Sequence, residues 1–198
     1  MDKLNQKKIM CPKPIKNKKG KYLTTIKHKS ACIVTFLKGK DKSHLDYKNC
    51  FDVGKNIAKF HKVTSKIGLY RENSMSVIKL AGLLKSIKFK SIKKTLDLKS
   101  TLNKNLRDIK REWPKNLPAG IIHGDLFVDN IFFDKNKFSG FIDFYFSSND
   151  YLMYEIAICI NALCFDKKKE KFLMNSQKIT NLINGYESVR ILSKKEKN

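Results

Sequence analysis

Several features are scarce in this 198-residue sequence, and each shortage excludes a class of protein. No apolar run approaches the roughly 20 residues needed to cross a bilayer; the most apolar stretch, IAICINALCF, has about half that length. The opening MDKLNQKKIMCPKP has no apolar h-region, so we expect no secretory signal. The five cysteines form no CxxC pair, so we expect reduced, mostly buried thiols in a cytoplasmic protein without a membrane partner.

Arginine is also scarce: only four of the 42 basic residues are arginine, although the formal net charge is +24. Nucleic-acid recognition favours the planar guanidinium, and an excess of Lys, Asn and Ile over Ala is what an AT-rich coding sequence produces. We therefore interpret most lysines as solvated faces rather than a polyanion site. A basic nucleic-acid-binding module over residues 79–111, with 11 bases against two acids, and a non-catalytic remnant remain the alternatives.

The charge is unevenly distributed along the chain. Residues 1–110 carry 29 bases and seven acids, whereas residues 111–198 carry 13 bases and 11 acids. Six acids against two lysines fall within residues 125–155. One explanation for this acidic island is a bound metal cation.

The pattern of apolar and turn residues predicts a mixture of strands and helices. We expect strands in KYLTTI and SACIVTFL, a helix capped by Ser43, and two amphipathic helices over 76–111 with a break near Ser91–Lys94. Trp113-Pro114 should stop the second of these. Further on we expect a strand in GIIHGD, a hairpin from NIFFD to FIDF, a buried helix over 150–165 and an amphipathic helix over 168–185.

The chemically informative segment begins at His123 and contains Asp125 and Asn130, with Asp143 on the following hairpin. The spacing H-x-D-x-x-x-x-N matches the catalytic loop of kinases, and the later aspartate matches their metal-binding aspartate. Phosphoryl transfer needs a carboxylate that accepts the proton of the acceptor hydroxyl. It also needs hard oxygen ligands that hold Mg²⁺ against the phosphates.

Together with CPKPI, ACIVTFLKG, VGKNIAKFHK, residues 118–166 and GYESVRILSKKE, this segment resembles the aminoglycoside phosphotransferase/choline kinase-like superfamily and, within it, the bacterial homoserine kinases. The resemblance covers essentially the whole chain and implies an α+β, protein-kinase-like fold. Residues 1–40 would be a remnant of the N-lobe (strand pair and hinge), and residues 41–198 a C-terminally incomplete C-lobe.

The same resemblance implies a role for individual residues. Asp125 would be the catalytic base, with His123 supporting the loop; Asn130 and Asp143 would ligate Mg²⁺; the hinge backbone at Thr35, Phe36 and Leu37 would hold the adenine of ATP; and Asp150 would brace the loop. His61 lies beside an apolar helical stripe, and we interpret it as a core residue. The residues that bind the acceptor stay unassigned.

A glycine-rich phosphate loop and a strand lysine should precede CPKPI in such kinases, yet the ten residues before Cys11 contain no glycine. We therefore expect a kinase core truncated at both ends, with little activity alone and a complementing N-terminal fragment as partner. The parent reaction would be ATP + L-homoserine → ADP + O-phospho-L-homoserine, in threonine biosynthesis. The alternative within this class is a kinase for another small alcohol, of the choline or aminoglycoside type.

Overall fold

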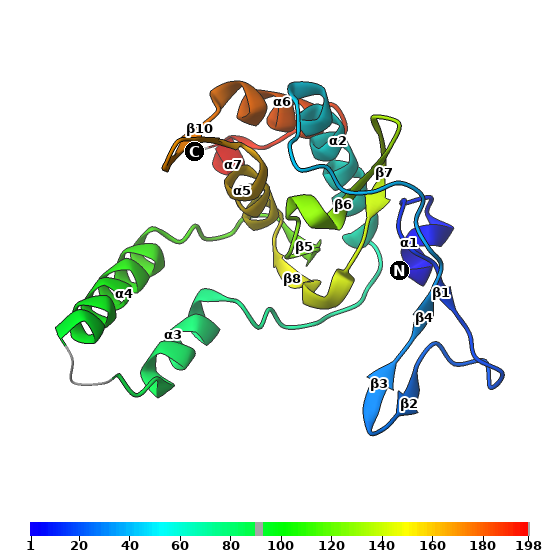
Figure 1. Ribbon diagram of the computed structural model, residues 1–198, viewed down its shortest axis with the longest axis horizontal. Helices are drawn as coiled ribbons and strands as arrows, with labels where there is room; N and C mark the ends of the chain where they lie inside the picture. Colours follow the sequence, from blue (N-terminus) through cyan, green and yellow to red (C-terminus); the bar gives the residue numbers. More distant parts are fainter. Residues whose placement is uncertain (90–92, 198) are drawn as a thin grey trace.

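The N-terminal part of the chain forms short strands rather than a broad sheet. The computed structural model describes residues 1–89 and 93–197. Helix α1 (Asp2–Gln6) precedes β1 (Pro14–Ile15), which pairs antiparallel with β4 (Ile33–Val34). Between them β2 (Thr24–Ile26) and β3 (Lys29–Ala31) form a hairpin that projects from the body (Figure 1). The strand predicted in KYLTTI is present but shorter, as β2, whereas the strand predicted in SACIVTFL is divided into β3 and β4, which pair with different partners.

The main core is built on helix α2 (Tyr47–Thr64), which lies beside α6 (Ser176–Glu187) (Figure 1). Its stripe of Cys50, Val53, Ile57 and Phe60 is buried, as the three- and four-residue spacing predicted. The prediction that Ser43 caps this helix is wrong. Asp46 is the N-cap, and it exchanges hydrogen bonds with Asn49 in a capping box, which satisfies two helix-end amides at once.

Two antiparallel pairs lie next to this core. Strand β5 (Ala119–Ile122) pairs with β8 (Ser148–Tyr151), and β6 (Ile131–Asp134) forms the predicted hairpin with β7 (Lys137–Phe141). The buried helix expected over 150–165 is α5 (Leu152–Leu163). The 3₁₀ turns η1 (Val128–Asn130) and η2 (Phe144–Phe146) occupy the bends of this region, and α7 (Lys194–Lys197) is the last helix.

Helices α3 (Val77–Ser86) and α4 (Lys93–Glu112) stand away from the rest of the chain (Figure 1). Helix α4 ends just before Trp113-Pro114, as predicted, because proline cannot continue a helix. The predicted break near Ser91–Lys94 falls largely on residues 90–92, outside the described residues. Leu98 and Ile109, on the predicted apolar stripe, are about half-exposed.

The prediction of one helix over 168–185 is wrong at its start. Strands β9 (Phe165–Lys168) and β10 (Lys171–Met174) form a hairpin there, with Lys169 at φ 54° in its turn. Helix α6 begins only at Ser176, where the Asn175 side chain accepts a hydrogen bond from the Lys178 amide. Within residues 1–89 and 93–197, no helix combines the length and the apolar character that a membrane span needs.

Candidate active site

The predicted catalytic loop begins where β5 ends. His123 is fully buried, and its Nε2 lies 2.7 Å from the carbonyl oxygen of Ile142, so Nε2 carries the proton and donates it. Gly124 follows with φ +80°, and a Cβ there would lie 2.9 Å from the Phe146 carbonyl oxygen, so glycine suits this bend. His123 thus ties the loop to the strand that leads into Asp143.

Asp125 and Asn130 meet across the loop. The Asn130 side-chain amide donates to the Asp125 carbonyl oxygen at 2.8 Å and to its carboxylate Oδ2 at 3.1 Å. Burial of the carboxyl raises the pKa of Asp125, and the charge of Asp143 raises it further, against the opposing effect of His123 and Asn130. A higher pKa makes this carboxylate a better proton acceptor near neutral pH.

Asp143 lies directly beyond the hairpin. It adopts a left-handed conformation, φ 55°, and its Oδ1 accepts a hydrogen bond from the Tyr145 amide. The Ile142 amide donates to the Asn130 carbonyl oxygen at 3.1 Å, which places Asp143 next to the predicted loop ligand. The structure therefore brings Asp125, Asn130 and Asp143 together from two separate segments.

The donor chemistry of this group fits a hard divalent cation. Asn130 uses its amide nitrogen on Asp125, which leaves its side-chain oxygen for a ligand, and Asp143 offers carboxylate oxygens. In the described part of the chain no three His, Cys, Asp or Glu residues form a complete metal cage. Mg²⁺ characteristically binds one or two protein oxygens and takes its other ligands from phosphates and water.

A carboxylate that sequence reasoning did not assign holds the loop from behind. Glu155 of α5 is fully buried; its Oε2 accepts from the His123 amide at 2.6 Å and its Oε1 from the Gly124 amide at 2.8 Å. Burial alone would raise the pKa of Glu155, but the hydrogen bonds from the His61 ring and from the His123 amide leave the pKa below its usual value. The available signal was a lone acid inside the apolar run LMYEIAICI.

Asp150 makes its hydrogen bonds elsewhere. Its carboxylate accepts from Asn73 at 2.6 Å and from the Tyr151 amide at 2.7 Å. In the part of the chain that the structure describes, the His123 and Gly124 amides donate to Glu155 and not to Asp150. The bracing role predicted for Asp150 thus falls to Glu155 at these two amides.

The predicted nucleotide segment packs on the β6–β7 hairpin. Thr35 exchanges hydrogen bonds with Lys13, Leu37 lies against Gly140, and Phe36 is 91% exposed. Three residues beyond Leu37, Lys40 pairs with Phe133 through both of its backbone groups. The segment thus lies on the strands that lead to Asp143, although no described hydrogen bond joins it to the catalytic loop.

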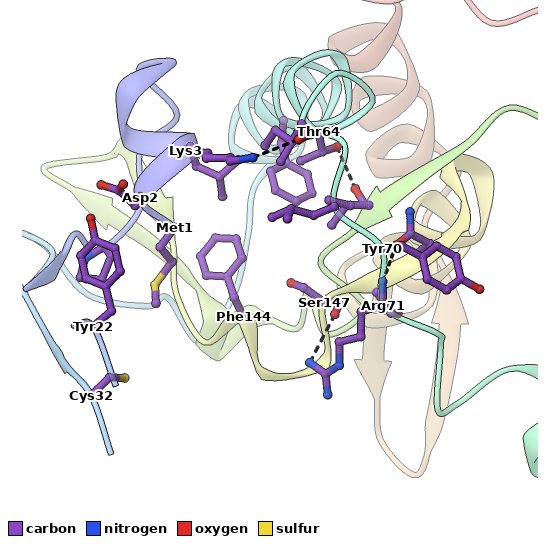
Figure 2. Close-up of a pocket in the computed structure, with 18 of the residues that line it drawn as sticks. Met1, Asp2, Lys3, Tyr22, Cys32, Thr64, Tyr70, Arg71, Phe144 and Ser147 are labelled. Carbon is purple, nitrogen blue, oxygen red and sulfur yellow. Dashed lines mark hydrogen bonds between the residues drawn. The ribbon is translucent and has the colours of Figure 1, made fainter. Parts of the chain in front are cut away.

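A mostly apolar cavity of about 650 Å³ lies next to Asp143, because the following residue, Phe144, is part of its lining. Figure 2 shows Phe144, the residue after Asp143, within it, together with Met1 and Ser147. Arg71 closes one side and donates to the Ser147 carbonyl oxygen at 3.3 Å. Asp125, Asn130 and Asp143 do not line this cavity, so it is not the space in which their side chains would act.

Solved structures with the same arrangement of elements define the class. Amicoumacin kinase hAmiN, in complex with AMP-PNP, Ca²⁺ and Ami, gives a TM-score of 0.71 over 96% of this chain and 60% of that one, at 16% identity. Aminoglycoside-3'-phosphotransferase of type VIII gives 0.64 over 98% and 72%, at 14% identity. The fold is that of the protein-kinase-like phosphotransferases.

The sequence narrows this class. A profile of the phosphotransferase enzyme family (APH) matches residues 1–192, so the chain belongs to that family. It is 37% identical over 196 residues to the homoserine kinase of Rhizobium meliloti (strain 1021), covering 99% of this chain and 59% of that relative. It is 39% identical over 202 residues to the homoserine kinase of Paramagnetospirillum magneticum, covering 99% and 61%. The chain thus spans about 60% of the length of these curated relatives.

Proposed function

We propose that this chain is the core of an ATP-dependent kinase that phosphorylates the hydroxyl of L-homoserine. The observation that carries the proposal is the contact of Asn130 with Asp125, and of the Asn130 backbone with the residue before Asp143. The homoserine kinases to which the chain is 35–39% identical support this acceptor over other small alcohols.

In the proposed reaction Asp125 orients the acceptor hydroxyl and takes its proton as the oxygen attacks the γ-phosphate of ATP. Its raised pKa suits this task because a base is most effective when its pKa lies nearer the working pH. His123 holds the loop through Ile142, and Asn130 fixes the Asp125 carboxylate. These contacts orient the base before substrate binds, and preorganisation of this kind lowers the barrier.

Asn130 and Asp143 would hold Mg²⁺, and the backbone of residues 35–37 would hold the adenine. When bound, the cation neutralises charge on the phosphates. The contribution of this chain is to fix the two ligands by the backbone hydrogen bond between Ile142 and Asn130.

We further propose that a strand-forming segment completes the N-terminal sheet. An isolated two-stranded pair is marginally stable and has unpaired edges. The β1–β4 pair is such a unit, and its Ile15 and Ile33 are 47% and 69% exposed. A complementing segment would cover these side chains and supply the phosphate loop and strand lysine expected of a kinase.

The test offers L-homoserine, choline or kanamycin, with ATP and Mg²⁺, to this chain alone and to this chain fused to the N-terminal segment of the Rhizobium meliloti homoserine kinase. We expect the fusion to phosphorylate homoserine at least about 100-fold faster than the chain alone, because the added segment would bring further donors to the transition state. An Asp125→Asn fusion should bind nucleotide and lose turnover. Phosphorylation of choline but not homoserine would overturn the acceptor assignment.

A further inference from the structure

Behind Glu155 lies a row of buried polar side chains that the proposed chemistry does not use. His61 of α2 is fully buried; its Nε2 lies 3.4 Å from Glu155 Oε2 and its Nδ1 lies 2.9 Å from the Tyr186 hydroxyl of α6. Arg190 Nη1 lies 3.3 Å from the same hydroxyl. The row connects the end of α6 to the back of the catalytic loop.

The donors in this row all point the same way. A guanidinium only donates, so the Tyr186 hydroxyl oxygen accepts from Arg190, which leaves the hydroxyl proton for His61 Nδ1. Burial raises the pKa of Tyr186 to about 12, so that proton is retained. An ionised carboxylate only accepts, so His61 Nε2 carries a ring proton and directs it at Glu155 Oε2.

Glu155 accordingly accepts three donors, two of them the loop amides. Both of its oxygens are engaged, and the rotation of the carboxylate decides whether the two amides can be bound at the same time. His61 contacts Oε2, the oxygen that also accepts from the His123 amide. An apolar side chain at position 61 would fill the same space and leave this oxygen one donor short.

We propose that His61 is a positioning residue: through Glu155 it fixes the start of the catalytic loop at His123 and Gly124. The inference rests on the proposed function, because it treats this loop as the one that carries the base. His61 is buried in the core, as predicted, and the positioning role is an addition to that interpretation. Burial and the contact with Phe60 agree with either role, whereas hydrogen bonds at both ring nitrogens agree with positioning.

The test measures amide hydrogen exchange at His123 and Gly124 in the full chain, by NMR, for His61→Leu, His61→Gln and Ile57→Val. Ile57 lies one turn away on α2 and is equally buried, so Ile57→Val controls for lost core stability. We expect His61→Leu to speed exchange of these two amides about tenfold relative to the amides of β6, because a hydrogen bond to a charged group is lost. His61→Gln, which retains a donor, should restore most of the protection.

A second variant keeps the inference testable if His61→Leu does not fold. Tyr186→Phe removes only the hydroxyl that fixes the tautomer, so we expect a smaller rise in exchange at the same two amides and a change in the ring-nitrogen shifts of His61. Equal effects of His61→Leu and Ile57→Val, or no rescue by His61→Gln, would overturn the inference. Because exchange needs no substrate, this result is independent of whether the chain phosphorylates homoserine.

Discussion

At the scale of single residues, the buried carboxylate of Glu155 connects the core to the predicted catalytic loop. Glu155 sits in an apolar helix, yet it stays ionised because loop amides and His61 surround it with donors. Its contribution therefore depends on pH. Since the pKa of Glu155 is lowered in the folded chain, its stabilisation is present above the unfolded value near 4.5 and is lost as the pH falls through the folded value.

We predict that Glu155→Gln reduces the free energy of unfolding at pH 7 by about 1–3 kcal/mol, because it replaces a charged acceptor of buried amides. The same variant should lose less additional stability than the parent chain between pH 5 and pH 3 (about the window of carboxylate titration). Urea denaturation across this range measures both effects. Glu170→Gln, on the exposed β9–β10 turn, is the control, and an equal pH slope for Glu155→Gln and the parent would contradict the prediction.

At the scale of elements, helices α2 and α6 approach one another unusually closely at two glycines. A Cβ on Gly54 would lie 1.9 Å from the Leu182 carbonyl oxygen, and one on Gly185 would lie 2.0 Å from that of Phe51. Both obstacles are backbone atoms, which cannot rotate away. The helices therefore pack backbone to backbone, and this places His61 and Tyr186 within hydrogen-bond distance.

We predict that Gly54→Ala destabilises the chain by about 3 kcal/mol, since overpacking must separate the two helices. Gly82→Ala is the matched control, because Gly82 lies in α3 and nothing would come within 4 Å of its Cβ. There the better helix propensity of alanine should stabilise α3 by about 0.5–1 kcal/mol. Thermal unfolding of the two variants distinguishes packing from propensity, and a stabilised Gly54→Ala chain would disprove close packing.

The elements also show what the sequence could predict. Local spacing was sufficient for the hairpin of β6 and β7, for the buried stripe of α2 and for the order of Asp125, Asn130 and Asp143. It could not predict the Asp46 cap in place of Ser43, because both residues are good caps and the choice depends on where the preceding loop docks. The role of Glu155 could not be predicted, because the amides that it binds lie 31 and 32 residues away in the sequence and no short motif connects them.

At the scale of the whole molecule, the net charge of +24 and the acidic site belong to different regions. Many of the lysines lie on exposed turns and on helices α3 and α4 with their flanking residues, which we call the α3–α4 arm. Asp125 and Asp143 lie instead where the predicted catalytic loop meets the β6–β7 hairpin. A field of this kind attracts any polyanion without recognising one. If residues 79–111 formed a dedicated nucleic-acid-binding module, DNA affinity would depend on the lysines of that segment. If the charge is only diffuse, lysines elsewhere on the surface would matter equally.

We predict that the chain binds duplex DNA only weakly at 150 mM salt, with a dissociation constant above about 1 μM and a steep salt dependence. Replacing Lys79, Lys85 and Lys88 by Gln on the arm should reduce the slope of log K against log salt by no more than replacing Lys167, Lys168 and Lys171 on the β9–β10 hairpin. Both triples remove three exposed charges, so a diffuse field responds equally to each. Nanomolar binding that persists at this salt concentration and is lost only with the arm triple would instead make the arm a dedicated nucleic-acid site. Fluorescence anisotropy across a salt series, with circular dichroism to confirm folding, measures the difference.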